Sequence, residues 1–189
     1  MSDKRRERLM SYSGKNMVYS MLAVVGLAFA WWAIAPQPEE DQRRPVEVVQ
    51  IADYAATQAD WPVWSPVLGE DWTANTAEFA TLEGVPTWRT GWTSPETTYV
   101  ALRQAVDPTD GWRQDVLRGM QQQEDLMLPG PAGEQAWQVF TGVSDNDEDE
   151  VSLVLKPSGD QPAVTIVHGT ADVAQMSTFV GSLQVVASE

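Results

Sequence analysis

Residues 87–106 read TWRTGWTSPETTYVALRQAV, two runs of alternating apolar and polar residues joined by a turn sequence. Trp88 and Trp92 share one face of the first run, and in the second run Leu102 lies on the face opposite to Arg103. Strict alternation is typical of strands that bury one face and leave the other to solvent, and the SPE sequence between the runs favours a turn. The stretch therefore predicts a half-buried antiparallel hairpin.

Further strands and helices follow outward from this hairpin. Asp110 is a candidate N-cap for a helix that carries Trp112, and Thr170 is a candidate N-cap for a final helix near the C-terminus. A helical stripe over 46–59 predicts a third short helix. Because regular βαβ alternation is missing, we predict an α+β fold with an antiparallel sheet of about six strands and packed helices. The other four predicted strands span 72–80, 135–142, 151–156 and 163–168.

The N-terminal region carries a long apolar stretch. Residues 17–35, MVYSMLAVVGLAFAWWAIA, contain no charge, and as a helix they would extend about 28 Å, close to the ~30 Å hydrocarbon core of a bilayer. Residues 1–16 sum to +3 and residues 39–189 sum to −18, so the positive-inside rule predicts a cytoplasmic N-terminus. We therefore predict a basic cytoplasmic tail (1–16), a transmembrane helix (17–35), a linker (36–45) and an extracytoplasmic domain (46–189).

A cleaved signal peptide is the alternative for the same stretch. The Ala33-Ile34-Ala35 sequence resembles a small-residue cleavage site, and cleavage after Ala35 stays open. The following Pro36 and an apolar run longer than the usual 7–15 residues favour an uncleaved signal anchor in the cell membrane.

Composition excludes several classes of function. A domain that carries −18 is a poor partner for nucleic acid, whose phosphates attract Lys and Arg. The chain has no Cys, which excludes disulfides, a thiol nucleophile and Cys-ligated metals. Neither a dinucleotide-binding G-x-G-x-x-G nor a P-loop, an H-E-x-x-H or a G-x-S-x-G sequence occurs. We therefore predict no cofactor, no catalytic residues and a protein that is not an enzyme.

The densest charge cluster is a weak candidate for a cation site. Asp145, Asp147 and Asp149 have the alternate spacing of a calcium loop, but the sixth position is Glu150 where Gly is needed and the twelfth is Lys156 where Glu is needed. An EF-hand is therefore rejected, and a solvated hairpin turn is favoured over adventitious cation binding.

The only His and the many Trp residues are the remaining candidates. His168, at the end of a predicted strand, is interpreted as structural or solvent-facing, because a lone His cannot build a His-ligated metal site on its own. Most Trp residues outside 17–35 are predicted to form a Trp-rich core. Trp61 and Trp64 lie in a Pro-flanked segment, so we predict that these two contact a partner.

Several stretches resemble a known family. They are 62–63, 66–67, 71–73, 87–93, 99–104, 165–171 and 182–183. Together with the N-terminal apolar helix they resemble the actinobacterial domain-of-unknown-function family 4245 over most of residues 17–186. The resemblance implies a membrane-anchored envelope protein and supplies no activity or site residues. The order of strands and helices is similar to the Mog1/PsbP-like sandwich, which concerns the fold alone.

Three functions stay open at this point. The first is a non-enzymatic, single-pass membrane protein whose acidic domain binds a protein partner in the cell envelope. The second is a domain that binds a sugar, a lipid or a cationic solute, which requires a concave pocket lined by Trp. The third is a hydrolase, which requires two carboxyl groups facing each other across a cleft, about 5–9 Å apart for glycosidic chemistry.

Overall fold

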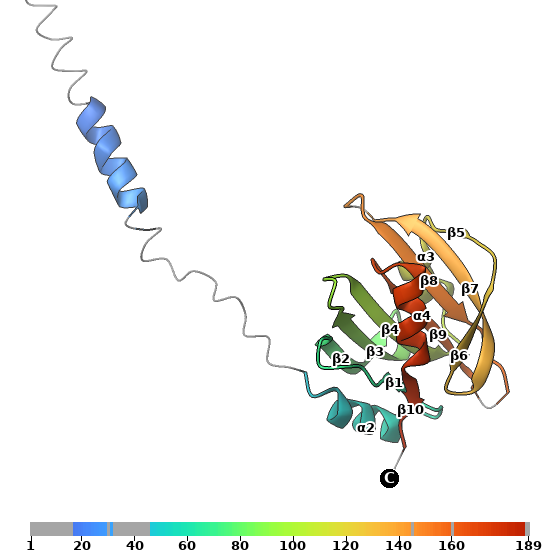
Figure 1. Cartoon of the computed structure of the whole chain (residues 1–189). Helices are drawn as coiled ribbons and strands as arrows, with labels where there is room; N and C mark the ends of the chain where they lie inside the picture. The colour runs from blue at the N-terminus through green and yellow to red at the C-terminus, as the bar shows by residue number, and fades with distance from the viewer. Residues whose placement is uncertain (1–16, 30, 32–45, 145, 160, 188–189) are drawn as a thin grey trace, which may run out of the picture. The chain divides into compact units, whose positions relative to one another are not determined.

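The predicted hairpin forms in the computed structural model as β3 (Val85–Thr93) and β4 (Tyr99–Val106), the second and third strands of a larger antiparallel sheet (Figure 1). Among the described residues this sheet has eight strands, in the order β2-β3-β4-β9-β8-β7-β5, with β6 paired to β7. A separate two-stranded sheet joins β1 (Trp64–Pro66) to β10 (Leu183–Val185). The other strands are β2 (Thr73–Leu82), β5 (Gln121–Gln122), β6 (Leu126–Gly130), β7 (Gly133–Val143), β8 (Asp149–Leu155) and β9 (Ala163–Gly169).

The six predicted strands all form, and the α+β class is confirmed, but the prediction of about six strands is too low. The strands missed are β1, β5, β6 and β10, each two to five residues long. Such short segments carry too few residues for an alternating pattern. Pro129 and Gly130 also predicted a loop where β6 forms. Among the described strands β6 pairs with β7 alone, and a strand at the sheet edge tolerates a proline.

Three helices pack on this framework: α2 (Val48–Gln58), α3 (Asp110–Leu117) and α4 (Val173–Gly181). The predicted caps are displaced by one or two residues. Thr109, not Asp110, caps α3 and accepts a hydrogen bond from the Trp112 backbone N–H at 3.2 Å. Asp172, not Thr170, caps α4 and accepts from the Gln175 N–H at 2.8 Å.

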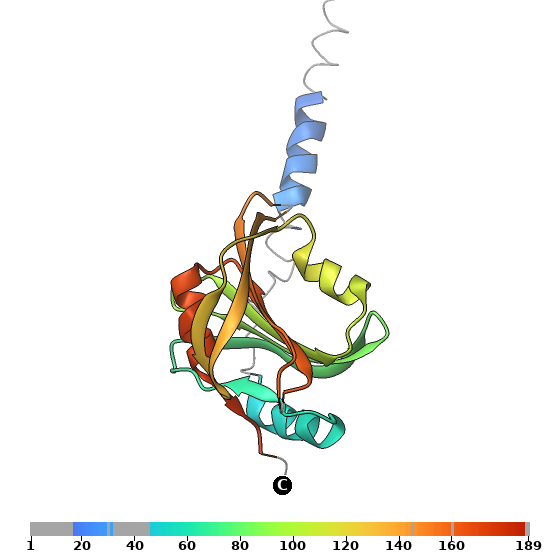
Figure 2. The same ribbon diagram turned by 90° about the vertical axis from the view of Figure 1, so that its right-hand side faces the viewer.

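The two faces of the sheet have different coverings. The first face carries Trp88 and packs against α4, whose Met176 and Phe179 are fully buried. The second face packs against α3 through Trp112 and Val116. Figure 2 shows α3 and α4 on opposite sides of the sheet. Because α3 is only eight residues long, it covers one part of the second face and leaves the rest available for a site.

The predicted Trp-rich core is confirmed. Trp64, Trp88, Trp112 and Trp137 are at most 1% exposed. Trp88 donates its indole N–H to the Trp64 carbonyl at 2.8 Å, and Trp112 donates its indole N–H to the Thr87 hydroxyl at 2.9 Å. Burial on this scale stabilises the domain without any disulfide.

The N-terminal region is a separate compact unit, 1–42, apart from 43–189. The structure describes residues 17–29, 31, 46–144, 146–159 and 161–187, and of the first unit it shows a helix over 17–29 and 31 with exposed side chains. No helix within the described residues has both the length and the apolar character needed to cross a membrane. The predicted transmembrane helix (17–35) is described only over residues 17–29 and 31. The tail (1–16) and the linker (36–45) lie wholly outside the described residues, so the three assignments stay predictions.

Candidate functional site

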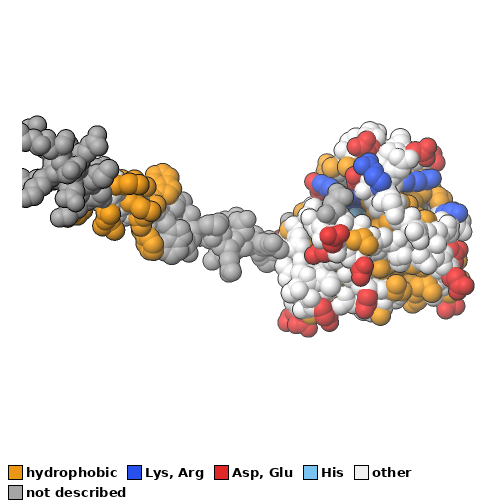
Figure 3. Space-filling view, turned by 90° about the horizontal axis from the view of Figure 1, so that it is seen from above, with side chains coloured by type: hydrophobic (Ala, Val, Ile, Leu, Met, Phe, Trp, Pro, Cys, Tyr) orange, Lys and Arg blue, Asp and Glu red, His pale blue; other side chains and the backbone are white. Residues whose placement is uncertain are grey.

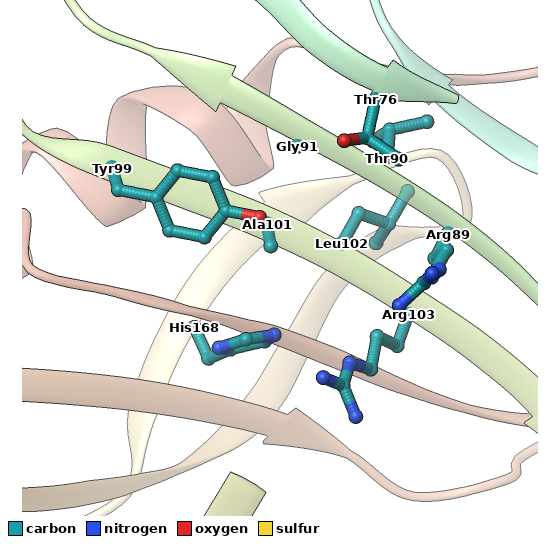
Figure 4. Close-up of a pocket in the computed structure, with 9 residues that line it drawn as sticks. All are labelled: Thr76, Arg89, Thr90, Gly91, Tyr99, Ala101, Leu102, Arg103 and His168. Atoms are coloured by element: carbon teal, nitrogen blue, oxygen red, sulfur yellow. The ribbon is translucent and has the colours of Figure 1, made fainter. Parts of the chain in front are cut away.

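A polar pocket of about 90 Å³ lies on the second face of the sheet. It is the candidate site, and we name it the arginine pocket because Arg89 on β3 and Arg103 on β4 contribute to its lining (Figure 4). The side chains of these arginines, of Tyr99 and of His168 surround one space in the close-up. Gly91 and Ala101 also line the pocket.

Strand register brings these residues together. Arg89 is directly opposite Arg103 in the β3–β4 pair, and Gly91 is opposite Ala101. Ala101 in turn is opposite His168 of β9. Because successive side chains on a strand alternate between faces, all five lie on the second face, opposite to Trp88 and Leu102.

Each arginine already has one carboxylate partner. Arg103 donates from Nη1 to Oδ2 of Asp115 on α3 at 2.7 Å. Arg89 forms an ion pair with Glu78, its direct neighbour on β2. The Arg103 side chain is 14% exposed and that of Arg89 is 40% exposed, so Arg103 lies deeper in the domain.

His168 is neutral in this environment. Its Nε2 atom is enclosed and has no hydrogen-bond partner among the described residues. Burial lowers the pKa of His168 to about 3, Arg103 lowers it further, and Asp115 opposes the shift. A general base works best with a pKa near the working pH, so His168 is suited to hydrogen bonding and poorly suited to proton transfer at neutral pH.

Tyr99 lies over small residues. A Cβ atom added to Gly91 would lie 3.2 Å from Cζ of the Tyr99 ring, so a side chain at position 91 would displace the tyrosine. Burial raises the pKa of Tyr99, while Arg103 and Arg89 act in the opposite direction. The phenol therefore keeps its proton at neutral pH and can act as a hydrogen-bond donor.

The desolvation of the His168 imidazole predicts a measurable loss of stability in mild acid. An unfolded His has a pKa near 6.5, so between pH ~6.5 and ~3 unfolding takes up a proton that the folded chain does not bind. The free energy of unfolding therefore decreases as the pH falls below ~6.5, by about 1.4 kcal/mol per pH unit until the pH reaches ~3. From pH 7.5 to pH 5.0, the free energy of unfolding should fall by about 2 kcal/mol more in the wild type than in His168→Gln. Urea unfolding at both pH values measures this, and equal losses in the two proteins would contradict it.

The structure does not support an exposed contact at Trp64. Its side chain is only 1% exposed and belongs to the core. Its strand, β1, is paired with β10. Trp61 is half-buried and packs against Phe79, with 6.0 Å between ring centroids. A role for Trp61 in partner contact stays a prediction.

The acidic turn gains no support as a cation site. Asp145 lies outside the described residues, Asp147 lies in the β7–β8 turn, and Asp149 is the first residue of β8, opposite Val143. The Ser144 hydroxyl accepts hydrogen bonds there from the backbone N–H groups of Asn146 and Glu148. In the described part of the chain no group of three His, Cys, Asp or Glu side chains is placed to hold a metal ion.

The cavity beside Trp64 and the arginine pocket do not favour the alternatives that need a particular pocket. A cavity of about 420 Å³ includes Trp64 in its lining, but that Trp is almost fully covered and cannot offer its face to a sugar ring. Among the described residues, Glu134 is the one carboxylate that lines this cavity, and none lines the arginine pocket. The described residues of these two pockets therefore include no facing carboxyl pair of the kind that a glycoside hydrolase requires.

Sequence reasoning missed the arginines and Tyr99 as site residues and interpreted His168 as structural or solvent-facing. The available signal was Arg103, which the alternating pattern placed on the face opposite to the apolar residues. Arg89 has the same pattern, as a charge between Trp88 and Thr90. Two arginines on the same face of a hairpin in so acidic a domain could have indicated the pocket.

Comparison with known proteins places the chain in a family. The model of the family described as "Protein of unknown function (DUF4245)" matches residues 10–183, and the chain belongs to this family. The predicted resemblance is thereby confirmed. No curated protein matches the chain. No solved structure matches it either.

Proposed function

We propose that the chain is a single-pass membrane protein of the cell envelope whose α+β domain acts outside the cytoplasm as a binding module and not as an enzyme. The charge distribution supports the orientation, since a basic N-terminal segment precedes the apolar stretch and a strongly acidic domain follows it. The observation that carries the binding role is the arginine pocket.

The chemistry of that pocket favours recognition over catalysis. Arg89, Arg103 and Tyr99 supply hydrogen-bond donors, and the low pKa of His168 keeps its imidazole from serving as a general base near neutral pH. The functional role is therefore to hold a partner group through hydrogen bonds. Two arginines in the lining argue against a cationic solute as the occupant.

The absence of Cys makes the proposed orientation simple to test. We expect a Val143→Cys variant, whose site on β7 is 62% exposed, to react with a membrane-impermeant maleimide on intact cells. A Ser2→Cys variant should react only after lysis, because its thiol would lie on the cytoplasmic side. Labelling of Ser2→Cys alone on intact cells, or of neither variant before lysis, would contradict the proposal.

The binding role needs a matched pair of variants. Crosslinking of the full chain in its membranes should capture a partner whose yield falls several-fold in Arg103→Gln. Arg113→Gln makes the same change of charge at an exposed site on α3 and should leave the yield unchanged. Equal capture by both variants would remove the arginine pocket from the proposal.

A further inference from the structure

The two arginines of the pocket stand in an unfavourable arrangement. Arg89 and Arg103 are direct cross-strand partners, and like charges placed opposite each other destabilise a sheet. Residues 46–189 contain five basic and 22 acidic side chains, so two of the five basic groups meet at this one place. In Figure 3 the Lys and Arg side chains in view gather on one side of the domain, and the His lies among them.

The hydrogen bonds of the arginines leave donors unused. A guanidinium carries five N–H donors. Arg103 uses Nη1 for Asp115, and no other side-chain hydrogen bond from it is found among the described residues, although the side chain is only 14% exposed. Arg89 directs Nε and Nη2 at one oxygen of Glu78, which leaves Nη1 free of a described partner.

The remaining lining residues add further polar groups to the pocket, and the residue beneath the Tyr99 hydroxyl is a glycine. The Tyr99 hydroxyl lies over Gly91, close to where a Cβ would stand on any other residue. His168 contributes an enclosed Nε2 without a described partner. No carboxylate is among the described residues that line the pocket, and its volume of about 90 Å³ suits a group of a few heavy atoms.

We infer that the arginine pocket binds a compact oxyanion, the carboxylate or phosphoryl group of a ligand or partner. Guanidinium groups can donate two parallel hydrogen bonds to a pair of oxygens on a carboxylate or phosphoryl group, and these charge-assisted bonds are stronger than those to neutral acceptors. A bound oxyanion would also relieve the repulsion between Arg89 and Arg103. Because Glu78 and Asp115 already neutralise part of this charge, we expect a dissociation constant on the order of 1 mM for a small free anion. This inference rests on the proposed binding function and specifies its chemistry.

The single His makes the test specific. Because His168 is the only His of the chain, its imidazole NMR signals report on the pocket, provided the purification tag contains no His. The full chain in a neutral detergent is titrated at pH 7.5 with inorganic phosphate and, separately, with acetate, against chloride at the same ionic strength. We expect a saturable shift of the His168 signals with at least one of the two oxyanions. The oxyanion that binds with the higher affinity, phosphate or acetate, shows whether the natural group is phosphoryl or carboxylate.

Three variants decide whether the shift comes from the pocket. Arg103→Gln and Arg89→Gln should each weaken binding about tenfold or more, as expected for the loss of a charge-assisted hydrogen bond. Arg89 is the more exposed of the two, so its variant keeps the test valid if the loss of Arg103 disturbs folding. Arg113→Gln should change the affinity less than about twofold.

Two results would overturn the inference. One is a set of His168 signals that does not move with either oxyanion, or that moves equally with chloride. The other is a loss of affinity in Arg113→Gln as large as in Arg103→Gln. Neither result affects the membrane orientation or the captured partner, so a failure of the ligand class is distinguishable from a failure of the proposed function.

Discussion

Replacing Gly169 with Ala should lower the free energy of unfolding by at least about 4 kcal/mol. Losses this large are exceptional for a single substitution and indicate a severe steric or packing defect. Gly169 ends β9 with a φ of +154° and is paired with Val100 on one side and Val151 on the other. A Cβ atom there would lie 2.7 Å from the carbonyl carbon of Tyr99 and 3.1 Å from Cα of Val100. Both are backbone atoms in the middle of the sheet, so no side-chain rotation can relieve the clash.

Thermal unfolding of the full chain measures this effect. For a domain of this size we expect a melting temperature about 8–16 °C below that of the wild type. Gly69→Ala is the matched control, since nothing lies within 4 Å of its Cβ position, and its change should stay within about 0.5 kcal/mol. A Gly169→Ala protein as stable as Gly69→Ala would show that β4 and β9 do not approach as closely as described.

The second large effect is expected from truncating Trp112. Its side chain is fully buried between α3 and the second face of the sheet, and it donates a hydrogen bond to the Thr87 hydroxyl. Removing a buried Trp leaves a cavity and costs about 3–5 kcal/mol. Because α3 also carries Asp115, the partner of Arg103, loosening this helix should disturb the arginine pocket as well.

Two comparison variants separate the contributions in urea unfolding. Trp112→Phe keeps most of the apolar contact but loses the indole N–H, so we expect a smaller loss of about 1–2 kcal/mol. Val49→Ala removes a side chain that is 73% exposed and should change stability by no more than about 0.5 kcal/mol. If Trp112→Ala behaved like Val49→Ala, α3 would not be anchored as described.

The alternating pattern around Trp88 shows which features of the fold the local sequence predicts. Alternation alone separates Trp88 from Arg89 and Leu102 from Arg103, because a strand has a period of two residues. The same reasoning located the long strands, and the Trp-rich core followed from their apolar faces. It failed for β6, where Pro129 indicates a loop, because pairing with β7 at the sheet edge outweighs the local preference of the segment.

The arginine pocket depends on contacts that local pattern does not encode. β9 follows β8 in the chain, yet it lies between β8 and β4, and only this insertion sets His168 beside Ala101. The ion pair between Arg103 and Asp115 likewise depends on where α3 docks, which Trp112 and Thr87 decide. At Trp64 the local sequence indicated too much exposure. The flanking prolines indicate an exposed segment, whereas β1 pairs with β10 and the Trp64 side chain is buried.

The sequence by itself determined the separation of charge, the apolar N-terminal stretch, the long strands with their two faces, and the family, since each is a property of neighbouring residues along the chain. The tertiary structure alone decided that two arginines, a tyrosine and the only histidine share one pocket. Strand order and helix docking bring residues from β3, β4 and β9 together, and these are set by the burial of apolar surface across the whole domain. The excess of acidic charge therefore says little about what the domain binds, because its few basic groups include the two that line the candidate site.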